Sequence, residues 1–328
     1  CSSALIICGM VISEIGSVYI LTHCYRKSQR KLPPIVGPCP VLREISAIAA
    51  PIALSALLNN ILASANSILI PQRLIASGME KSAAISSFGV LFGMTIPLLS
   101  LPIAVISALT VVMVPKMSEG IARGSPSDLR RHAGKAIQTT GLLAFPAVGI
   151  LLPLGRELCQ LLYHQPNAGE YMLPLCIATL FSYYQISLTA LLNAIGLQRR
   201  AASIIVVGGI VQLIGTWLVG IPRIGIWGFL IGDIVSSILM AVFNFIPLTS
   251  HLSLHIRWRN WFLTPMLASI LAGLTARLVS LYSKSDGLSI GLSSILALAA
   301  AALVYLLALR VQGTSLISYL KKIKIQKQ

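Results

Sequence analysis

Long stretches without a single charged residue constrain this chain more than any other feature. Residues 45–72 and 82–115 are runs of 28 and 34 residues that contain no Asp, Glu, Lys or Arg. A helix needs roughly 20 apolar residues to cross the hydrocarbon core of a membrane. Other backbone conformations would leave their polar groups unpaired in lipid. The runs therefore predict an all-α fold, a polytopic membrane helical bundle.

Similar runs along the chain predict nine membrane-spanning helices in all. Charged residues make up only 10% of the chain, whereas soluble domains contain about 25%. The predicted spans cover approximately residues 2–22, 44–70, 82–113, 136–155, 171–194, 201–220, 224–248, 260–282 and 287–310.

The distribution of positive charge predicts the orientation of these helices. The net charge is +16, but it does not indicate a nucleic-acid partner, because 19 of the 25 Lys and Arg residues fall in alternate loops and in the tail that starts at Arg310. By the positive-inside rule, these loops and the C-terminus face the cytoplasm. The basic tail is then either a topology anchor or a specific lipid site.

The linker after the first span suggests how the chain is divided. It combines charged residues with four prolines, and we place a boundary near residue 41. Residues 1–41 would hold one helix and the linker, 42–250 six helices, and 251–328 two further helices. Because a spanning helix follows Cys1 almost at once and no soluble domain follows it, we expect a fragment of a longer transporter rather than a lipoprotein.

One helix carries an unusual polar stripe. At 100° per residue, Ser55, Asn59, Asn66 and Arg73 fall within about 40° of one another, and Asn60 lies one residue round from Asn59. The opposite side is Leu, Ile and Ala. Two interpretations stay open: a wall of a substrate cavity that meets sugar hydroxyls or phosphate, or hydrogen bonding between helices.

The next span contains candidate hinge residues. Gly93, Pro97 and Pro102 interrupt the regular backbone of residues 82–113, and each proline removes a helical hydrogen bond. The kinked helix is either a moving part or a static bend. The pair Gly228 and Gly232 has the G-x-x-x-G spacing that lets helices pack closely.

Several segments resemble one family of transporters. "LPPIVGPCPVLREISAIAAPIALSALLNNILASANSILIPQRL", "SFGVLFGMTIPLLSLPIAVISALTVVMVPKMSEG", "LCQLLYH" and "LLNAIGLQRRAA" are similar in order and spacing to stage V sporulation protein B and related polysaccharide-biosynthesis proteins. This family belongs to the multidrug/oligosaccharidyl-lipid/polysaccharide exporter superfamily.

The resemblance implies a fold like that of the multidrug and toxin extrusion transporters and lipid flippases, with two six-helix lobes and two further helices. It implies that the helix in 1–41 is the last of an incomplete N-terminal lobe and that the six helices in 42–250 form a complete lobe. It also implies that a lipid-linked saccharide, of the polyprenyl pyrophosphate type, is moved across the cytoplasmic membrane by alternating access, in spore or cell-envelope formation. The helices at 44–70 and 82–113 would line its cavity. We expect a monomer surrounded by membrane lipids.

Three charged residues fall inside predicted spans and are candidates for ion coupling or intramembrane pairing. Glu14 and Asp233 are carboxylates that would relay a proton, hold a sodium ion or pair with another residue such as Arg277. Arg277 lies near the outer edge of its span, where it would reach the interface or bind a lipid phosphate.

Other functions have weaker support in the sequence. A cation-coupled multidrug exporter would need acids along its cavity, and an integral-membrane polysaccharide polymerase would need acids or bases gathered near the membrane surface. The six cysteines show no metal-ligand spacing. His251 and His255 have the i, i+4 spacing of zinc ligands, but no third ligand lies near them in the sequence. We expect no catalytic residues, no metal, no cofactor, no disulfide and no bound nucleotide.

Overall fold

The computed structural model describes the backbone of residues 2–29 and 41–313, and the side chains of residues 9, 11–26 and 45–313. Throughout these residues the regular structure is helical. The helices are α1 (Ser2–Gln29), α2 (Val41–Ala76), α3 (Lys81–Val90), α4 (Ile96–Ala122), α5 (Pro126–Tyr163), α6 (Met172–Ala194), α7 (Gln198–Leu218), α8 (Trp227–Leu252), α9 (Thr264–Ser285) and α10 (Ile290–Val311). Shorter pieces are the π-helical η1 (Leu91–Thr95) and η3 (Arg259–Leu263) and the 3₁₀ helix η2 (Pro166–Tyr171).

Eight helical segments of the fully described part are long and apolar enough to cross a membrane. They begin at Ile45, Lys81, Pro126, Pro166, Gln198, Trp227, Arg259 and Ile290. The prediction of an all-helical, multi-pass membrane protein is therefore confirmed. The ninth predicted span, 2–22, lies within the helix α1 but is not among the eight, so its crossing remains a prediction.

The helices extend beyond the predicted spans at several ends. The largest difference is in α5, which runs from Pro126 to Tyr163 where the sequence predicted 136–155. Ser125 caps its start by accepting from the backbone N–H of Asp128 at 3.5 Å, and His164 ends it in a left-handed conformation at φ 55°. A charge-free run marks only the part of a helix that lies in hydrocarbon, because charged turns at either end reach water.

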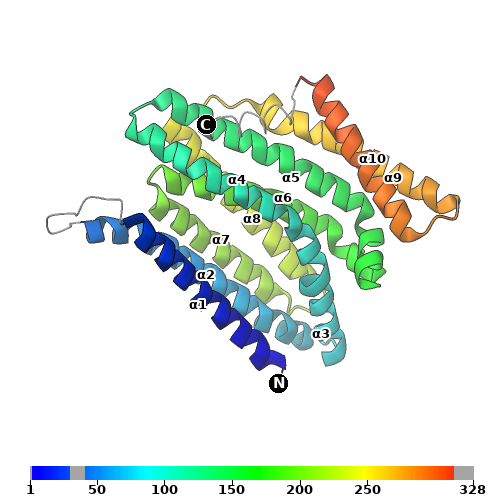
Figure 1. Cartoon of the computed structure of the whole chain (residues 1–328). Coiled ribbons are helices and arrows are strands. Elements are labelled where there is room, and N and C mark those ends of the chain that lie inside the picture. The colour runs from blue at the N-terminus through cyan, green and yellow to red at the C-terminus, as the bar shows by residue number, and fades with distance from the viewer. Residues whose placement is uncertain (1, 30–40, 314–328) are drawn as a thin grey trace. The chain divides into compact units, whose positions relative to one another are not determined.

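The chain divides into two compact units, Cys1–Ser46 and Ala47–Gln328. The first contains α1 and the start of α2. In the second, α9 packs on both α10 and α5, while α8 packs between α6 and α7 (Figure 1). The segment predicted as 251–328 thus shares a unit with the helices of the predicted six-helix lobe. Most of the predicted linker (30–40) and of the basic tail (314–328) lies outside the described residues.

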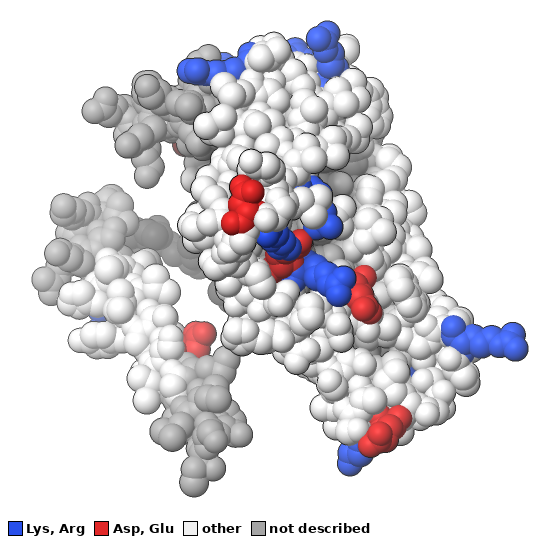
Figure 2. All heavy atoms as spheres, turned by 90° about the vertical axis from the view of Figure 1, so that its right-hand side faces the viewer, with Lys and Arg blue, Asp and Glu red and all other residues white. Residues whose placement is uncertain are grey.

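The core of the second unit consists of two buried apolar clusters. One surrounds Leu91, Leu154 and Met172, and the other surrounds Ile137 and Tyr183. Large apolar side chains on the outer faces are exposed, and most of the surface in Figure 2 is uncharged. An apolar exterior around a packed interior is what a bilayer requires, because lipid tails are as apolar as leucine.

Helices α7 and α8 approach most closely where both carry glycine. A Cβ atom added to Gly232 would lie 2.7 Å from the Cα of Gly215, and one added to Gly228 would lie 2.8 Å from the backbone N of Val219. The G-x-x-x-G spacing in α8 therefore serves close helix packing, as predicted. This contact sets the spacing of the polar residues that lie beside it.

Candidate functional site

The packed side of α2 carries one buried polar residue, Asn66. Its side chain is 5% exposed, and its Oδ1 accepts a hydrogen bond from the hydroxyl of Thr216 on α7 at 2.8 Å. The same hydroxyl lies 3.1 Å from the carbonyl oxygen of Gln212, one turn earlier. In an apolar environment this bond satisfies an amide oxygen that would otherwise cost free energy.

A second bond extends this contact to α8. The Gln212 side-chain amide donates to Oδ1 of Asp233 at 3.1 Å. Asn66, Thr216, Gln212 and Asp233 therefore form a line of polar side chains across three helices, which we call the polar seam. Two of its members, Asn66 and Asp233, come from the sequence prediction. Gln212 and Thr216 were missed because each stands alone among apolar neighbours.

Arg73 lies near the last turn of α2, beyond the seam. The carbon of its guanidinium lies 3.1 Å from the centroid of the Trp217 ring, a cation–π contact. Exposed tryptophans near the ends of membrane helices are typical of the membrane–water interface. Trp217 is 63% exposed, but it also holds the arginine that ends the predicted stripe. Pro71 does not interrupt the helix, which continues to Ala76.

The structure separates the other members of the stripe from the seam. Ser55 donates to the carbonyl of Pro51 within its own helix at 2.7 Å. Asn59 and Asn60 are exposed on α2. Interhelical hydrogen bonding, one of the two interpretations left open, therefore describes Asn66, whereas Asn59 and Asn60 present open amides.

The remaining charged candidates lie elsewhere. Glu14 is an exposed residue of α1 in the first unit. Arg277 on α9 donates to Oε1 of Glu157 on α5 at 2.8 Å, and Lys284 donates to the same oxygen at 2.8 Å. Arg277 thus pairs with neither Glu14 nor Asp233. Glu157 lies inside α5, where it is 6% exposed.

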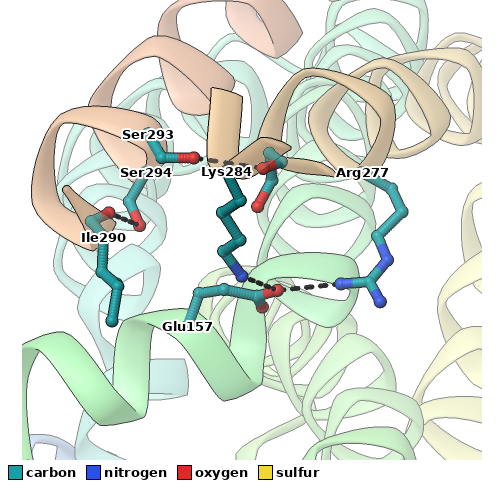
Figure 3. A network of polar contacts seen from close by, with 7 residues as sticks. Glu157, Arg277, Lys284, Ile290, Ser293 and Ser294 are labelled. Atoms are coloured by element: carbon teal, nitrogen blue, oxygen red, sulfur yellow. Dashed lines mark hydrogen bonds and ion pairs between the residues drawn. The ribbon is translucent and has the colours of Figure 1, made fainter. Parts of the chain in front are cut away.

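Figure 3 shows the two cations pointing from α9 toward Glu157 on α5, next to the start of α10. The Arg277 and Lys284 side chains are 48% and 35% exposed, and that of Glu157 is 7% exposed. The carboxylate is thus the buried partner, and its two cations reach toward the surface. The contact ties α5 to α9.

The hinge candidates lie at an irregular segment. Gly93 is part of η1, the π-helical turn that separates α3 from α4, and Pro97 and Pro102 follow in α4. The hydroxyl of Thr95 in η1 donates to the carbonyl of Ala168 in η2 at 3.0 Å. α3 and α4 run in different directions on either side of η1 (Figure 1). A π turn next to proline explains the bend physically.

Among the side chains that the structure describes, no group of three or more His, Cys, Asp or Glu is arranged to hold a metal ion. The polar seam itself consists of two amides, a hydroxyl and one carboxylate, and Arg73 lies beyond it.

Comparison with known proteins points in the same direction as the resemblance. The chain is 23% identical over 311 residues to stage V sporulation protein B of Bacillus subtilis, covering 92% of this chain and 59% of that protein. It is 29% identical over 133 residues to the sporulation protein YkvU of the same organism, covering 40% of this chain and 30% of that protein. No family model and no solved structure matches the chain.

These matches make the chain a distant homologue of stage V sporulation protein B. It spans about 59% of the length of that relative and 30% of the length of the other. Together with the eight apolar helices, they identify a multi-pass membrane protein related to sporulation proteins.

Proposed function

We propose that this chain contributes to a membrane transporter that flips a lipid-linked saccharide across the cytoplasmic membrane of a bacterium. The observation that carries the proposal is the match to stage V sporulation protein B, which extends over 92% of the chain. The path of the saccharide across the membrane would run along α2, where Asn59 and Asn60 are exposed. Saccharide hydroxyls both donate and accept hydrogen bonds, as amides do.

The chemistry of α2 favours this substrate class over cationic drugs. Residues 45–76 contain Ser, Asn and Gln side chains and one arginine, and they contain no acid. The Arg73 guanidinium lies over the Trp217 ring at the end of the helix, and a planar guanidinium can bind phosphate through two N–H groups. A lipid-linked diphosphate saccharide presents both kinds of group, hydroxyls and phosphate.

The proposal predicts a loss of transport when the amides of α2 become apolar. Asn59→Leu combined with Asn66→Leu should lower the initial rate of flipping about tenfold or more, since each lost hydrogen bond is worth about 1 kcal/mol. The rate is measured in vesicles that contain the complete product of the gene, from the quenching of a fluorescent polyprenyl diphosphate saccharide. Insertion into the vesicles should be unchanged.

Thr216→Val provides the matched control. It removes the hydroxyl that Asn66 accepts from but leaves both asparagines, so it weakens the seam without changing the α2 amides. We expect at most a threefold effect, about the value of one interhelical hydrogen bond in a membrane. Two results together would show that these amides only hold helices together. They are an unchanged flipping rate in Asn59→Leu and equal losses of rate in Asn66→Leu and Thr216→Val.

Alternating access also predicts that the irregular segment at η1 moves. A Cβ atom added to Gly93 meets nothing within 4 Å, so Gly93→Ala restricts the backbone without a clash. We expect the free energy of unfolding to increase by about 0.4–1 kcal/mol and the transport rate to fall severalfold. The measurement is the transport rate beside the free energy of unfolding. A more stable variant with an unchanged rate would identify the bend as static.

A further inference from the structure

A pocket lined by positive charge lies away from the polar seam and from the Glu157 cluster. It encloses about 550 Å³, a volume typical of ligand sites. One wall is the N-terminal part of α5, and the other is the connection from α8 to η3. The lining includes Arg130, Arg131, Lys135, Gln138, Arg257 and Trp261.

The periodicity of α5 places this wall on one face. Arg131, Lys135 and Gln138 follow at intervals of four and three residues, which is one side of a helix. Arg257 approaches from a different element, the segment after α8, so cations face the pocket from two sides. The lining contains no Asp or Glu. Because like charges gathered in one concave site repel one another, the pocket is electrostatically suited to an anion.

The tryptophan of the pocket is held against the α5 backbone. Trp261 is 3% exposed, and the hydroxyl of Tyr184 donates to its carbonyl oxygen at 3.3 Å. A Cβ atom at position 134 would lie 3.3 Å from the Trp261 ring, so Gly134 lets that ring lie close to the helix. The pocket therefore has an apolar, positioned side as well as a cationic rim.

The position of the pocket points to a membrane ligand rather than a soluble one. It lies at the end of the bundle where α5 begins and α8 ends, and both helices are long and apolar enough to cross a membrane. Trp258, three residues before Trp261, is 63% exposed, and exposed tryptophans mark the headgroup level of a bilayer. In Figure 2 the charged side chains visible at the upper end, where the α8–α9 connection lies in Figure 1, are Lys and Arg.

We propose that this pocket binds the phosphate of a membrane lipid headgroup, with Arg131 and Lys135 of α5 and Arg257 of the opposite wall as its ligands. Guanidinium groups bind phosphate oxygens through two N–H groups, and two walls can grip one headgroup. The phosphate comes either from an anionic phospholipid or from a lipid-linked diphosphate. The proposal depends on the chain lying in a membrane but not on its transporting anything.

The test is lipid binding by the purified full chain in micelles, followed by native mass spectrometry and by tryptophan fluorescence. The probes are phosphatidylglycerol, phosphatidylcholine, a polyprenyl diphosphate and inorganic pyrophosphate. The variant is Arg131→Gln with Arg257→Gln, and both residues are exposed at the surface, so folding should survive. The control is Arg199→Gln with Arg200→Gln, two exposed arginines whose loss changes the net charge equally.

We expect phosphatidylglycerol or the polyprenyl diphosphate to bind at least about tenfold more tightly than phosphatidylcholine. The variant with Arg131→Gln and Arg257→Gln should lose that preference. The control with Arg199→Gln and Arg200→Gln should change the affinity less than about twofold. Trp261→Phe should abolish the fluorescence response. Whichever of the two anionic lipids binds more tightly identifies the source of the phosphate. Equal losses in pocket variant and control, or inorganic pyrophosphate binding as tightly as the lipids, would overturn the proposal.

Discussion

Replacing Gly215 with alanine should strongly destabilise the second unit. The new Cβ atom would lie 2.5 Å from the Cα of Gly232 and 2.8 Å from the carbonyl oxygen of Gly228. Both are backbone atoms of α8, so no side chain can rotate away, and the helices must separate. We expect a cost of about 3 kcal/mol, the upper part of the range for overpacked cores.

The effect should also reach the polar seam. Gln212 lies three residues before Gly215 and donates to Asp233, which follows Gly232 directly. Separating α7 from α8 at the glycines would lengthen that hydrogen bond beyond its present 3.1 Å. The free energy of unfolding in mixed micelles measures the loss of stability, and the accessibility of a cysteine placed at position 212 measures how far α7 and α8 separate there.

Gly89→Ala is the matched control for this substitution. Gly89 lies within α3, and a Cβ atom there meets nothing within 4 Å. Alanine should therefore stabilise that helix by about 0.5–1 kcal/mol through its higher helix propensity. If Gly215→Ala and Gly89→Ala unfolded at the same denaturant concentration, close packing of α7 on α8 would not contribute to stability.

Replacing Glu157 with glutamine should give the second large effect. The variant leaves Arg277 and Lys284 facing a buried neutral group, and breaking a buried ion pair costs about 3–5 kcal/mol. Because the Arg277 and Lys284 side chains are 48% and 35% exposed, water offsets part of that loss. We therefore expect a decrease of about 2 kcal/mol in the free energy of unfolding.

Replacing either cation should lower the free energy of unfolding less than replacing Glu157 does. Lys284→Gln or Arg277→Gln alone leaves the carboxylate one partner at 2.8 Å, so each should cost about 1 kcal/mol or less. Glu170→Gln is the control, because Glu170 is exposed on η2, and its effect should stay within about 0.5 kcal/mol. If Glu157→Gln were as stable as Glu170→Gln, the ion pairs of Glu157 would not stabilise the packing of α5 on α9.

The sequence alone determined the class of fold and the approximate place of each helix after residue 44. A charge inside lipid is costly, so charge-free runs of 28 and 34 residues leave little choice but membrane helices. Glycine spacing similarly predicted the tight contact made by α8. The ends of α5 were not predictable in this way, because Lys135 on one side and Arg156 and Glu157 on the other bound the apolar run that defined the span.

Only the tertiary structure decided which polar residues meet. Asn66 and Thr216 are 150 residues apart in the chain, and Glu157 and Arg277 are 120 apart. Helical periodicity places Asn59 and Asn66 on one face of α2. It does not show which helix packs against that face or along which part of α2 the contact extends. A hydrogen bond or an ion pair depends on a few ångströms between two elements, and side-chain packing sets that distance rather than the order of residues along either helix.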